Sequence, residues 1–480
     1  MSALDRINHI VVLMLENRSF DNMLGMLYPK SAGFDGLDGT ETNLDANSNP
    51  VRVWNRPGTD ETTMTIPNPD PGELWADINT QLFGTAMPAP AARMAGFVRN
   101  YTSQAAQPAA AYKPGSVMHY FTPEQVPVIS RLARQFAVCD RWHASAPCQT
   151  WPNRFFVHTG TANGYENNSP PHFPYEMPTI FNRFEDLGIA NGWKIYFHDV
   201  PQSLTLAKLW PHLSGFRLYE EFQYDARTGN LPAYSFIEPR YFADVSLPND
   251  QHPPHVVTLG EQLIADVYNR LRNGPAWAET LLVIIYDEHG GCYDHVPPPK
   301  AKPPSSAPSS PFNFDRYGVR VPAVIVSPFI SQGTVLRPPG DTPFDHTSII
   351  ATLRKRFSLG APLSDREMVA PDLETVLSLS NPDNVGPEHI EPLPFVASPA
   401  DVAQAQAVPL NNMQESLLRL AAILPQENGE ADFASFIAGH VANLQADGAA
   451  AKLAAGDLNQ DVGSAVTIIK KSLGNFFRTL

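Results

Sequence analysis

The apolar residues of this chain fall into unbroken runs and helical repeats, and the two patterns alternate along the sequence. Residues 10–15, 281–286 and 321–326 are nearly continuous apolar runs rich in β-branched side chains. Such runs are typical of strands that are buried on both faces. Shorter apolar segments at 137–140, 193–197 and 234–237 predict three further strands.

Helical repeats lie between these strands. Apolar side chains recur every three or four residues over 126–136, 178–187 and 259–271, which predicts helices with one apolar face. Thr258 and Glu261 have the spacing of a capping box and are expected to begin the last of these helices. The alternation of strands and helices predicts an α/β fold, a three-layer sandwich around a mostly parallel sheet.

The pattern changes toward the C-terminus. Strand signals end at about residue 370, and residues 400–480 are alanine-rich with helical periodicity. The last fifteen residues, 466–480, are amphipathic and are expected to dock on the body of the protein or on a partner. We therefore divide the chain into a domain at 1–375 that carries the sheet and long loops, and a mainly helical region at 376–480.

Two segments of the larger domain have the composition of loops. Residues 29–90 are rich in glycine and asparagine and predict several short insertions rather than a separate domain. Residues 297–311 form a proline–serine segment that is expected to be exposed. The chain has 47 prolines in 480 residues, about twice the usual share, which indicates long ordered loops on a regular scaffold.

Charge, cysteine content and hydropathy narrow the class of protein. The net charge of −15 argues against a nucleic-acid-binding surface, and three cysteines are too few for a disulfide framework. The first apolar run is too short for a signal peptide, and no segment approaches the ~20 apolar residues of a membrane span. We expect a cytoplasmic protein, or a secreted one if a leader was removed or a non-classical export route is used. Peripheral membrane contact and oligomeric state stay open.

Polar residues follow directly on two of the apolar runs. Glu16 and Asn17 come at the end of the first, and Asp287 and Glu288 come at the end of 281–286. Adjacent carboxylates at a strand end are costly unless they are solvated, protonated or paired with a cation. Because ligands bind beyond the carboxyl ends of parallel strands, we expect these side chains to converge on one site.

A threonine and a histidine stand at the starts of two predicted helices. Thr150 is in the N-cap position of a helix expected to end at Gly160, and His346 opens one expected to reach about Phe357. Capping alone accounts for a threonine in such a place. A helix N-terminus also suits a phosphate, and a metal-activated hydroxyl there is suited to attack phosphorus. Oxygen ligands with histidines nearby favour one divalent metal ion, with Ca, Mg, Mn and Zn all open.

These residues lie in segments that resemble the bacterial and plant phosphoesterase family. The segments are HIVVLMLENRSFDNMLG at 9–25, TWPNR at 150–154, NDQHPP at 249–254, DEHGGCYDHVPPP at 287–299 and DHTSII at 345–350. They occur in order over about residues 5–375. The family contains non-specific and phosphatidylcholine-type phospholipases C and an acid phosphatase, and it is related in fold to alkaline phosphatases and sulfatases. The resemblance therefore implies an alkaline-phosphatase-like fold.

The resemblance also implies a metal site and a nucleophile. Glu16, Asn17, Asp287 and Glu288 match the positions that hold the active-site metal. Thr150 matches the nucleophile, which would bind the metal as well. The implied reaction is metal-dependent hydrolysis of phosphate esters through a phosphothreonine. It would be of the phospholipase C type on phospholipids or phosphodiesters, or of the acid phosphatase type on phosphomonoesters.

Four further residues lie in the matching segments. His252 and His346 match active-site histidines, to which we assign phosphate stabilisation or protonation of the leaving group. Asn153 and His295 lie within the motifs and are included as candidate catalytic residues. One departure concerns Glu73, because a histidine that helps to bind the substrate phosphate often stands at this place in the family. The glutamate makes the predicted pocket less positive and is expected to shift the substrate range.

Two other readings compete with a phosphoesterase. A sulfatase would need a cysteine or serine that is converted to formylglycine, and Cys148 lies two residues before Thr150, which is poorly placed for that role. A non-catalytic binding protein would keep the metal only as a structural element. The presence of both a nucleophile and a set of metal ligands weighs against this second alternative.

Overall fold

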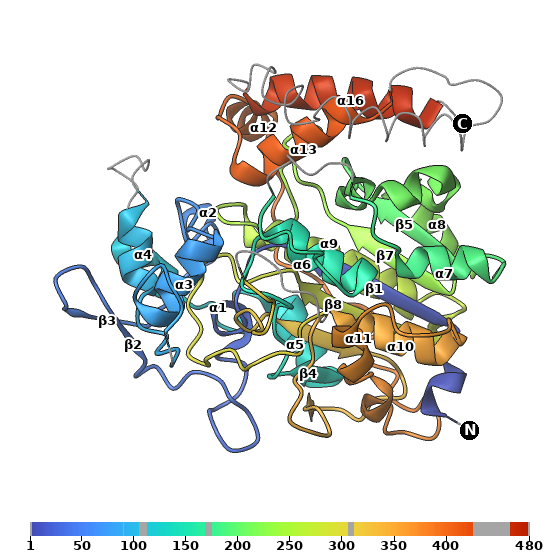
Figure 1. Ribbon diagram of the computed structural model, residues 1–480, viewed down its shortest axis with the longest axis horizontal. Helices are drawn as coiled ribbons and strands as arrows, with labels where there is room; N and C mark the ends of the chain where they lie inside the picture. The colour runs from blue at the N-terminus through green and yellow to red at the C-terminus, as the bar shows by residue number, and fades with distance from the viewer. Residues whose placement is uncertain are drawn as a thin grey trace.

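The computed structural model describes residues 2–89, 91–104, 113–168, 175–305, 312–425 and 461–478, and its centre is an eight-stranded sheet (Figure 1). The strand order is β10-β4-β9-β8-β1-β7-β5-β6, and β9 alone runs antiparallel to its neighbours within this sheet. The predicted mostly parallel sheet is confirmed. Its strands are β1 (His9–Leu15), β4 (Ala137–Cys139), β5 (Trp193–Phe197), β6 (Phe216–Leu218), β7 (Tyr234–Glu238), β8 (Thr280–Tyr286), β9 (Ala323–Val326) and β10 (Thr334–Leu336).

The first and second apolar runs form the middle of the sheet. β1 and β8 pair in parallel over their full lengths, from His9 opposite Thr280 to Leu15 opposite Tyr286. All of β8 is buried, as are the last six residues of β1. Because the two strands end in register, the residues that follow them are neighbours, and the Asp287 N–H donates to the Leu15 carbonyl oxygen at 3.2 Å.

The third apolar run forms a strand whose direction the sequence did not reveal. β9 pairs antiparallel with both β8 and β4, so its carboxyl end lies at the opposite edge of the sheet from theirs. The carboxyl end of this run therefore does not lie beside those of the first two. The short strand β10, parallel to β4, returns the chain toward the edge where β1 and β8 end.

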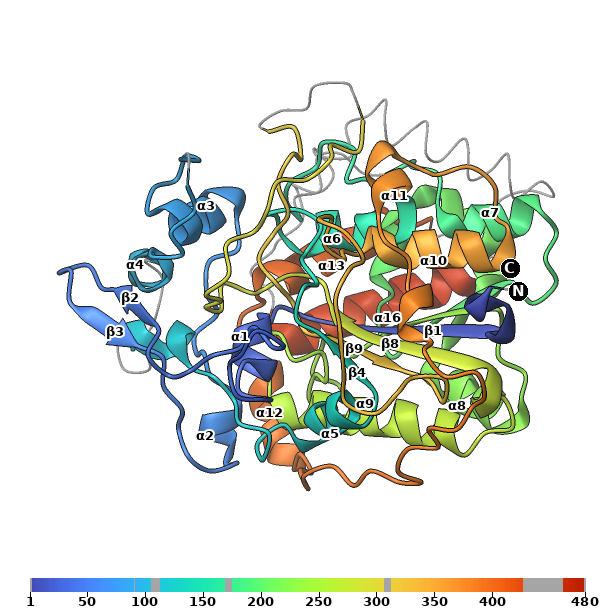
Figure 2. The same cartoon turned by 90° about the horizontal axis from the view of Figure 1, so that it is seen from below.

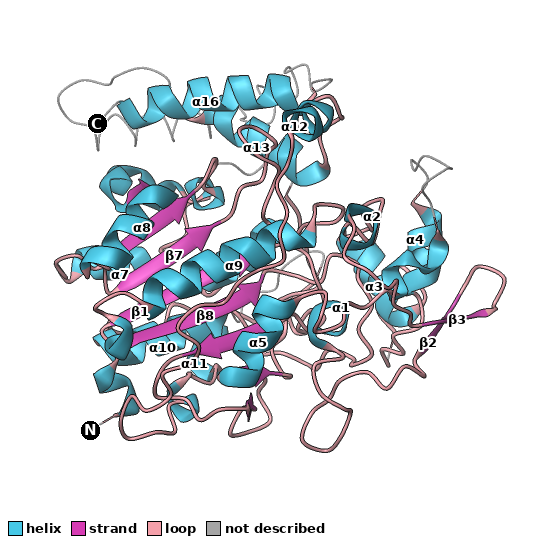
Figure 3. Cartoon of the chain, turned by 180° about the vertical axis from the view of Figure 1, so that it is seen from behind, coloured by secondary structure: helices cyan, strands magenta, loops and turns pink. Residues whose placement is uncertain are grey.

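Helices cover both faces of the sheet, as predicted for three layers. Figure 1 shows one layer in front of the sheet, and Figure 3 shows helices of the other layer from behind. The front layer consists of α6 (Thr150–Thr159), α7 (Ile180–Asp186), α10 (Thr347–Phe357) and α11 (Asp365–Val369), and the back layer of α5 (Pro127–Gln135), α8 (Tyr219–Thr228) and α9 (Val257–Arg272). Short 3₁₀ helices are η1 (Ala3–Arg6), η2 (Pro114–Met118), η4 (Gln202–Thr205), η5 (Ala207–Gly215), η6 (Trp277–Glu279) and η7 (Glu374–Val376).

The predicted capping box of α9 is wrong. The helix begins at Val257, and the carboxylate of Glu261 instead accepts the N–H groups of Val128 and Ile129, at 2.6 and 3.2 Å. These two groups are unpaired donors in the first turn of α5, so Glu261 caps a neighbouring helix and joins the two helices of the back layer. Burial raises the pKa of Glu261 to about 8.

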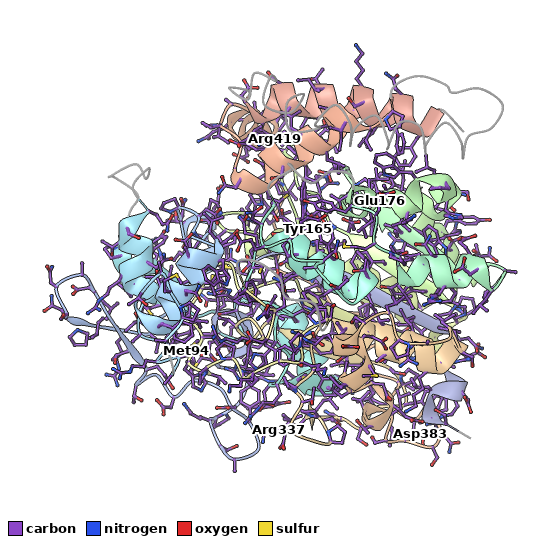
Figure 4. The ribbon with its side chains drawn as sticks, in the orientation of Figure 1. Met94, Tyr165, Glu176, Arg337, Asp383 and Arg419 are labelled. Carbon is purple, nitrogen blue, oxygen red and sulfur yellow. The ribbon has the colours of Figure 1, made fainter. Side chains whose placement is uncertain are left out.

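Residues 29–104 are more ordered than a set of loops. They form α2 (Glu61–Met64), α3 (Trp75–Phe83), α4 (Phe97–Ser103) and a hairpin of β2 (Thr42–Leu44) and β3 (Pro50–Arg52), which stand at one end of the molecule beyond α1 (Phe20–Leu24) (Figure 2). A small apolar cluster holds them together and includes Ile78, Tyr101 and Met94, which is labelled in Figure 4. Val117 and Val319 also belong to this cluster, so residues distant in the sequence complete it.

The C-terminal region is helical where it is described. It comprises α12 (Pro399–Gln406), α13 (Asn412–Ile423) and α16 (Val462–Arg478). Phe476 shares one hydrophobic core with Leu4, so the prediction that the last helix docks on the body is confirmed. Phe477 stacks on Phe197 of β5, and α16 therefore lies against the β6 edge of the sheet, far from Arg337 beyond β10 (Figure 4).

Parts of three predictions lie outside the described residues. These parts are 426–460 and 479–480 of the expected helical region, 306–311 of the proline–serine segment, and residue 90 of the loop segment at 29–90. The division of the chain at residue 375 stays a prediction. Residues of β5, β6 and α16 line a cavity of about 560 Å³. Thr150 and the other candidate site residues are not among the residues that line it. No helix in the described part of the chain is long and apolar enough to cross a membrane.

Candidate active site

Thr150 lies in the first turn of α6, but it is not the cap of the helix. Gln149 occupies the N-cap, and Thr150 is the first helical residue. The explanation of this threonine by capping alone is therefore wrong. Its hydroxyl oxygen Oγ1 lies 3.4 Å from Oε2 of Glu16 and 3.5 Å from Oδ1 of Asn17, and all three residues are buried. These separations are longer than the usual 2.7–2.8 Å of a hydroxyl hydrogen bond.

Asn153 shapes the turn that precedes the hydroxyl. Its Oδ1 accepts the Ala146 N–H at 3.0 Å, and its Nδ2 donates to the carbonyl oxygens of Cys148 and Gln149 at 2.9 and 3.2 Å. The side chain is fully buried and is engaged with the backbone of residues 146–149. This geometry positions Thr150 at the helix start.

Arg154 is a site residue that the sequence analysis missed. Its Nη2 donates to Oε1 of Glu16 at 2.5 Å, and its Nε lies 3.6 Å from Oδ2 of Asp287. Burial raises the pKa of Glu16 well above its usual range, and the Arg154 guanidinium opposes that shift. The signal was present, because Arg154 lies four residues after Thr150 and such residues share a helix face.

The turns after β1 and β8 are packed backbone against backbone. Asn17 has φ +56° and Gly290 has φ +58°, a conformation that favours glycine and tolerates asparagine. A Cβ atom on Gly290 would lie 2.0 Å from the Asn17 carbonyl oxygen, so no larger residue fits there. The Asn17 N–H donates to Oδ1 of Asp287 at 2.9 Å, and its Nδ2 donates to Oε1 of Glu288 at 2.8 Å. The predicted convergence of the two strand ends is thus present.

The carboxyl groups of Asp287 and Glu288 are fully buried. Burial raises the pKa of Asp287 to about 6 and that of Glu288 to about 8. Oε2 of Glu288 accepts the Gly290 N–H at 2.9 Å, whereas Oδ2 of Asp287 has no hydrogen-bond partner in the described part of the chain. An orphaned, buried carboxylate oxygen is a donor to which a cation would bind.

The residues present fit a divalent cation. The Thr150 hydroxyl has carboxylate and amide oxygens of Glu16 and Asn17 within 3.5 Å, and the carboxyl group of Asp287 contacts that of Glu16. Oxygen ligands of this kind suit hard cations. Glu288 is turned toward its own backbone and the His289 ring. Among the described residues, the two most compact groups of potential ligands are others: Asp21, Asp294 and His295, and Asp70, Glu73 and His252.

The two candidate histidines differ in what their rings contact. His346 donates through Nε2 to the Asp287 carbonyl oxygen at 2.6 Å and accepts the Trp142 Nε1–H at Nδ1, so both ring nitrogens are engaged. His252 donates through Nδ1 to the Pro253 carbonyl oxygen at 2.7 Å, and its Nε2 faces Oε1 of Glu73 at 3.7 Å. Burial lowers the pKa of each histidine to about 4.

His295 lies in a different group of charged residues. Its Nδ1 lies 2.6 Å from Oδ2 of Asp21, and its Nε2 lies 3.1 Å from Oδ1 of Asp35. Arg320 binds Asp21 and Asp294 in the same group. Both nitrogens of His295 are therefore bound within this group, and the structure does not bring the ring to Thr150.

Cys148 faces away from the carboxyl groups. Its side chain belongs to an apolar cluster with Ala146, Phe156, Ala162 and Phe314. Burial raises the pKa of the thiol well above its usual range. A sulfatase-type nucleophile at Cys148 is therefore not supported by its position.

A hydroxyl among buried carboxylates, at the strand ends of a mostly parallel sheet, is the arrangement expected of an α/β enzyme of the phosphoryl-transfer class. The chain belongs to the phosphoesterase family, which matches residues 7–360, and it is a phosphoric ester hydrolase. It is 38% identical over 445 residues to non-specific phospholipase C3 of Arabidopsis thaliana, with 88% of this chain and 83% of that one covered. Phospholipase C A of Mycobacterium tuberculosis is 28% identical over 447 residues, with 79% and 78% covered.

Similarity to solved structures is weaker. A putative sulfatase from Bacteroides thetaiotaomicron has a TM-score of 0.35 and 12% identity, covering 52% of this chain and 69% of that one. A protein of the alkaline phosphatase superfamily from Vibrio parahaemolyticus has a TM-score of 0.32 and 11% identity, covering 51% and 64%. Likeness at this level does not bear on the activity of the chain.

Proposed function

We propose that this chain cleaves phospholipids or related phosphodiesters in the manner of a phospholipase C. The observation that carries the proposal is the Thr150 hydroxyl, held at a helix N-terminus beside Glu16 and Asn17. The relatives named non-specific phospholipase C support this choice of substrate, since two of them are 38% and 40% identical to the chain.

One divalent metal ion would be held by Glu16, Asn17, Asp287 and Glu288 together with Thr150. Bound there, such an ion lowers the pKa of a hydroxyl and offsets the charge of a phosphate. Oxygen donors of this kind accept Ca, Mg, Mn or Zn. The orphaned Oδ2 atom of Asp287 supports a cation in this place.

The reaction has two steps. Oγ1 of Thr150 loses its proton and attacks phosphorus, the bond from phosphorus to the alcohol oxygen breaks, and this oxygen takes up a proton from solvent as the alcohol leaves. Oε2 of Glu16 is a carboxylate acceptor near the hydroxyl proton, while Arg154 holds the other oxygen of the same carboxylate. Water then attacks the phosphothreonine, the bond from phosphorus to Oγ1 breaks, and the hydroxyl is restored.

The histidines are assigned separate tasks. His346 positions Asp287, because both of its ring nitrogens are used by the protein. His252 lies beside Glu73. Nδ2 of Asn17 donates to Oε1 of Glu73 at 2.6 Å and so links Glu73 to the residues around Thr150. The departing alcohol oxygen would therefore leave on the side of His252.

The test is a substrate panel assayed with and without a chelator. Phosphatidylcholine in vesicles, a soluble phosphodiester and a soluble phosphomonoester are compared at equal concentration. We expect chelator-sensitive release of diacylglycerol to dominate. Preferential hydrolysis of the phosphomonoester would replace the proposal by an acid phosphatase, and the absence of turnover on all three would contradict it.

A further inference from the structure

A second group of ligands adjoins the proposed metal site. Asp70 and Glu73 precede α3, and His252 lies in the segment between β7 and α9. One ligand atom from each of the three side chains lies within 4.8 Å of the others. Glu73 and His252 are buried, and the side chain of Asp70 is 24% exposed.

The orientation of His252 leaves a lone pair directed at a carboxylate. The Pro253 carbonyl oxygen can only accept, so Nδ1 of His252 carries the proton in their 2.7 Å hydrogen bond. In the neutral ring Nε2 is then an acceptor, and it faces Oε1 of Glu73 at 3.7 Å without a hydrogen bond. Two buried acceptors that face each other repel unless a cation or a proton lies between them.

Charge balance points the same way. The two adjoining groups contain five carboxyl groups, namely those of Glu16, Asp70, Glu73, Asp287 and Glu288. Within the described residues, Arg154 forms ion pairs with Glu16 and Asp287, and the buried Arg18 acts electrostatically on Asp70. One divalent ion and these two guanidinium groups leave one carboxylate uncompensated, and a substrate phosphate would add further negative charge.

We propose that Asp70, Glu73 and His252 hold a second divalent metal ion beside the first. Two carboxylates and one imidazole nitrogen are ligands that suit Zn²⁺ or Mn²⁺. Ligand atoms at ~2.1 Å from an ion lie about 3–4 Å apart, which agrees with the 3.7 Å between Nε2 of His252 and Oε1 of Glu73. Nδ2 of Asn17 donates to both Glu73 and Glu288 and so connects the two groups.

This inference deepens the proposed function and rests on it for the identity of the first site. A second cation on the side of His252 would stabilise the departing alcohol oxygen. A positive charge there removes the need for a protonated histidine.

Metal stoichiometry tests the proposal. The full chain is stripped with a chelator, dialysed against Zn²⁺ or Mn²⁺, and analysed for bound metal per chain. We expect two equivalents in the unchanged protein and one in Glu73→Gln, which keeps the size of the side chain and removes its charge. Asp70→Asn is the second variant, and Glu61→Gln, an exposed acid of the same end of the molecule, is the matched control.

The outcomes separate the second ion from the proposed function. One equivalent of bound metal in the unchanged protein would overturn the second site and show that a shared proton lies between His252 and Glu73. Two equivalents of metal in a folded Glu73→Gln protein would overturn it as well. Thermal unfolding and circular dichroism identify variants that fail to fold. If the unchanged protein binds two metal ions and Glu73→Gln binds one, but no phosphate ester is hydrolysed, the second site is supported and the proposed function is contradicted.

Discussion

Two acidic groups in the described part of the chain are neutralised to different extents. One surrounds Thr150 and contains Glu16, Asp287 and Glu288. The other surrounds Arg320, and we call it the Arg320 group; it contains Asp21, Asp35, Asp294 and His295. Arg154 is the arginine that pairs with the first group, whereas the carboxylates of the Arg320 group are paired with both Arg320 and His295.

The Arg320 group satisfies its own charges. Nε of Arg320 donates to Oδ1 of Asp294 at 3.0 Å, and Nη2 donates to Oδ1 of Asp21 at 2.9 Å. His295 bridges Asp21 and Asp35, and although burial lowers its pKa, these hydrogen bonds raise the pKa to about 10. The compact arrangement of Asp21, Asp294 and His295 is thus already filled by a guanidinium.

The group around Thr150 is left with excess negative charge. Arg154 is its guanidinium partner, Oδ2 of Asp287 has no hydrogen-bond partner among the described residues, and burial raises the pKa of its carboxyl groups. Proximity of acidic side chains therefore does not distinguish a cation site from a structural ion network. What distinguishes the two is how much of the negative charge the cationic side chains of the protein leave uncompensated.

The largest expected effect comes from removing the Thr150 hydroxyl. Thr150→Val keeps the shape of the side chain but deletes the nucleophile, so kcat should fall by at least about 10³-fold. Steady-state hydrolysis of the preferred substrate measures this effect, with urea unfolding to verify that the fold is retained. Thr150→Ser retains a hydroxyl and should retain activity; a valine variant with a tenth of normal turnover would refute Thr150 as the nucleophile.

Substitution of Arg320 should lower the free energy of unfolding. Arg320→Met leaves Asp21 and Asp294 buried without their guanidinium, and we expect a loss of about 3–5 kcal/mol in the free energy of unfolding. Urea denaturation measures it. The matched control is Arg217→Met, whose half-exposed pair with Glu221 should cost only ~1 kcal/mol. Equal losses in the two variants would show that Arg320 does not hold an ion network.

Titration should separate the two groups, because their pKa shifts span different pH windows. In metal-free protein the folded state keeps the protons of Asp287 and Glu288 up to pKa values of about 6 and 8, whereas the unfolded chain releases them near 4. Unfolding free energy should therefore fall as pH rises from about 4 to 8. His295, with its raised pKa, contributes stability that is complete below pH ~6.5 and is lost as pH rises through about 10.

Metal should reduce the slope in the lower of these two windows, to which Glu261 also contributes, and should leave the upper window unchanged. Urea unfolding of stripped and metal-loaded protein between pH 4 and pH 10 provides the measurement. If metal leaves the slope below pH 8 unchanged, the carboxyl groups around Thr150 do not bind it.

The smallest expected effect concerns the link between α5 and α9. Glu261→Gln keeps one acceptor for the N–H groups of Val128 and Ile129, so we expect a loss of only about 1 kcal/mol near pH 4, where both side chains are neutral. Thermal unfolding should also become less dependent on pH near pH 8, where Glu261 titrates. A loss above ~3 kcal/mol would indicate that the carboxylate has a larger role than capping.

The sequence predicted the elements that are long and uniform. β1 and β8 are unbroken apolar runs, and the polar residues that end them are adjacent in sequence, so Glu16 and Asp287 could be placed at one site without a structure. β10 and the hairpin of β2 and β3 have three residues per strand, too few for a periodic signal. The direction of β9 depends on the edge of the sheet at which the preceding loop enters it, and the residues of the strand itself carry no information about that edge.

Interactions between distant residues account for the remaining differences. Glu261 matches a local capping pattern, yet the unpaired donors of α5 lie closer to its carboxylate in space than those of its own helix start. Arg154 was visible in the TWPNR segment, but its role depends on Glu16 and Asp287 being near, which only the fold establishes. His295 matched a family motif, and the charges of Asp21 and Asp35 that hold it could not be foreseen.

The contact between Asn17 and Gly290 has a consequence for how this protein can change. The main chains of the two turns touch, so neither turn can gain or lose a residue, or a side-chain carbon at Gly290, without displacing the other. Insertions and deletions should therefore accumulate away from these turns, in the hairpin of β2 and β3 and in the helices beyond α11. Substrate range could then diversify through those outer segments while the distance from Glu16 to Asp287 stays constant.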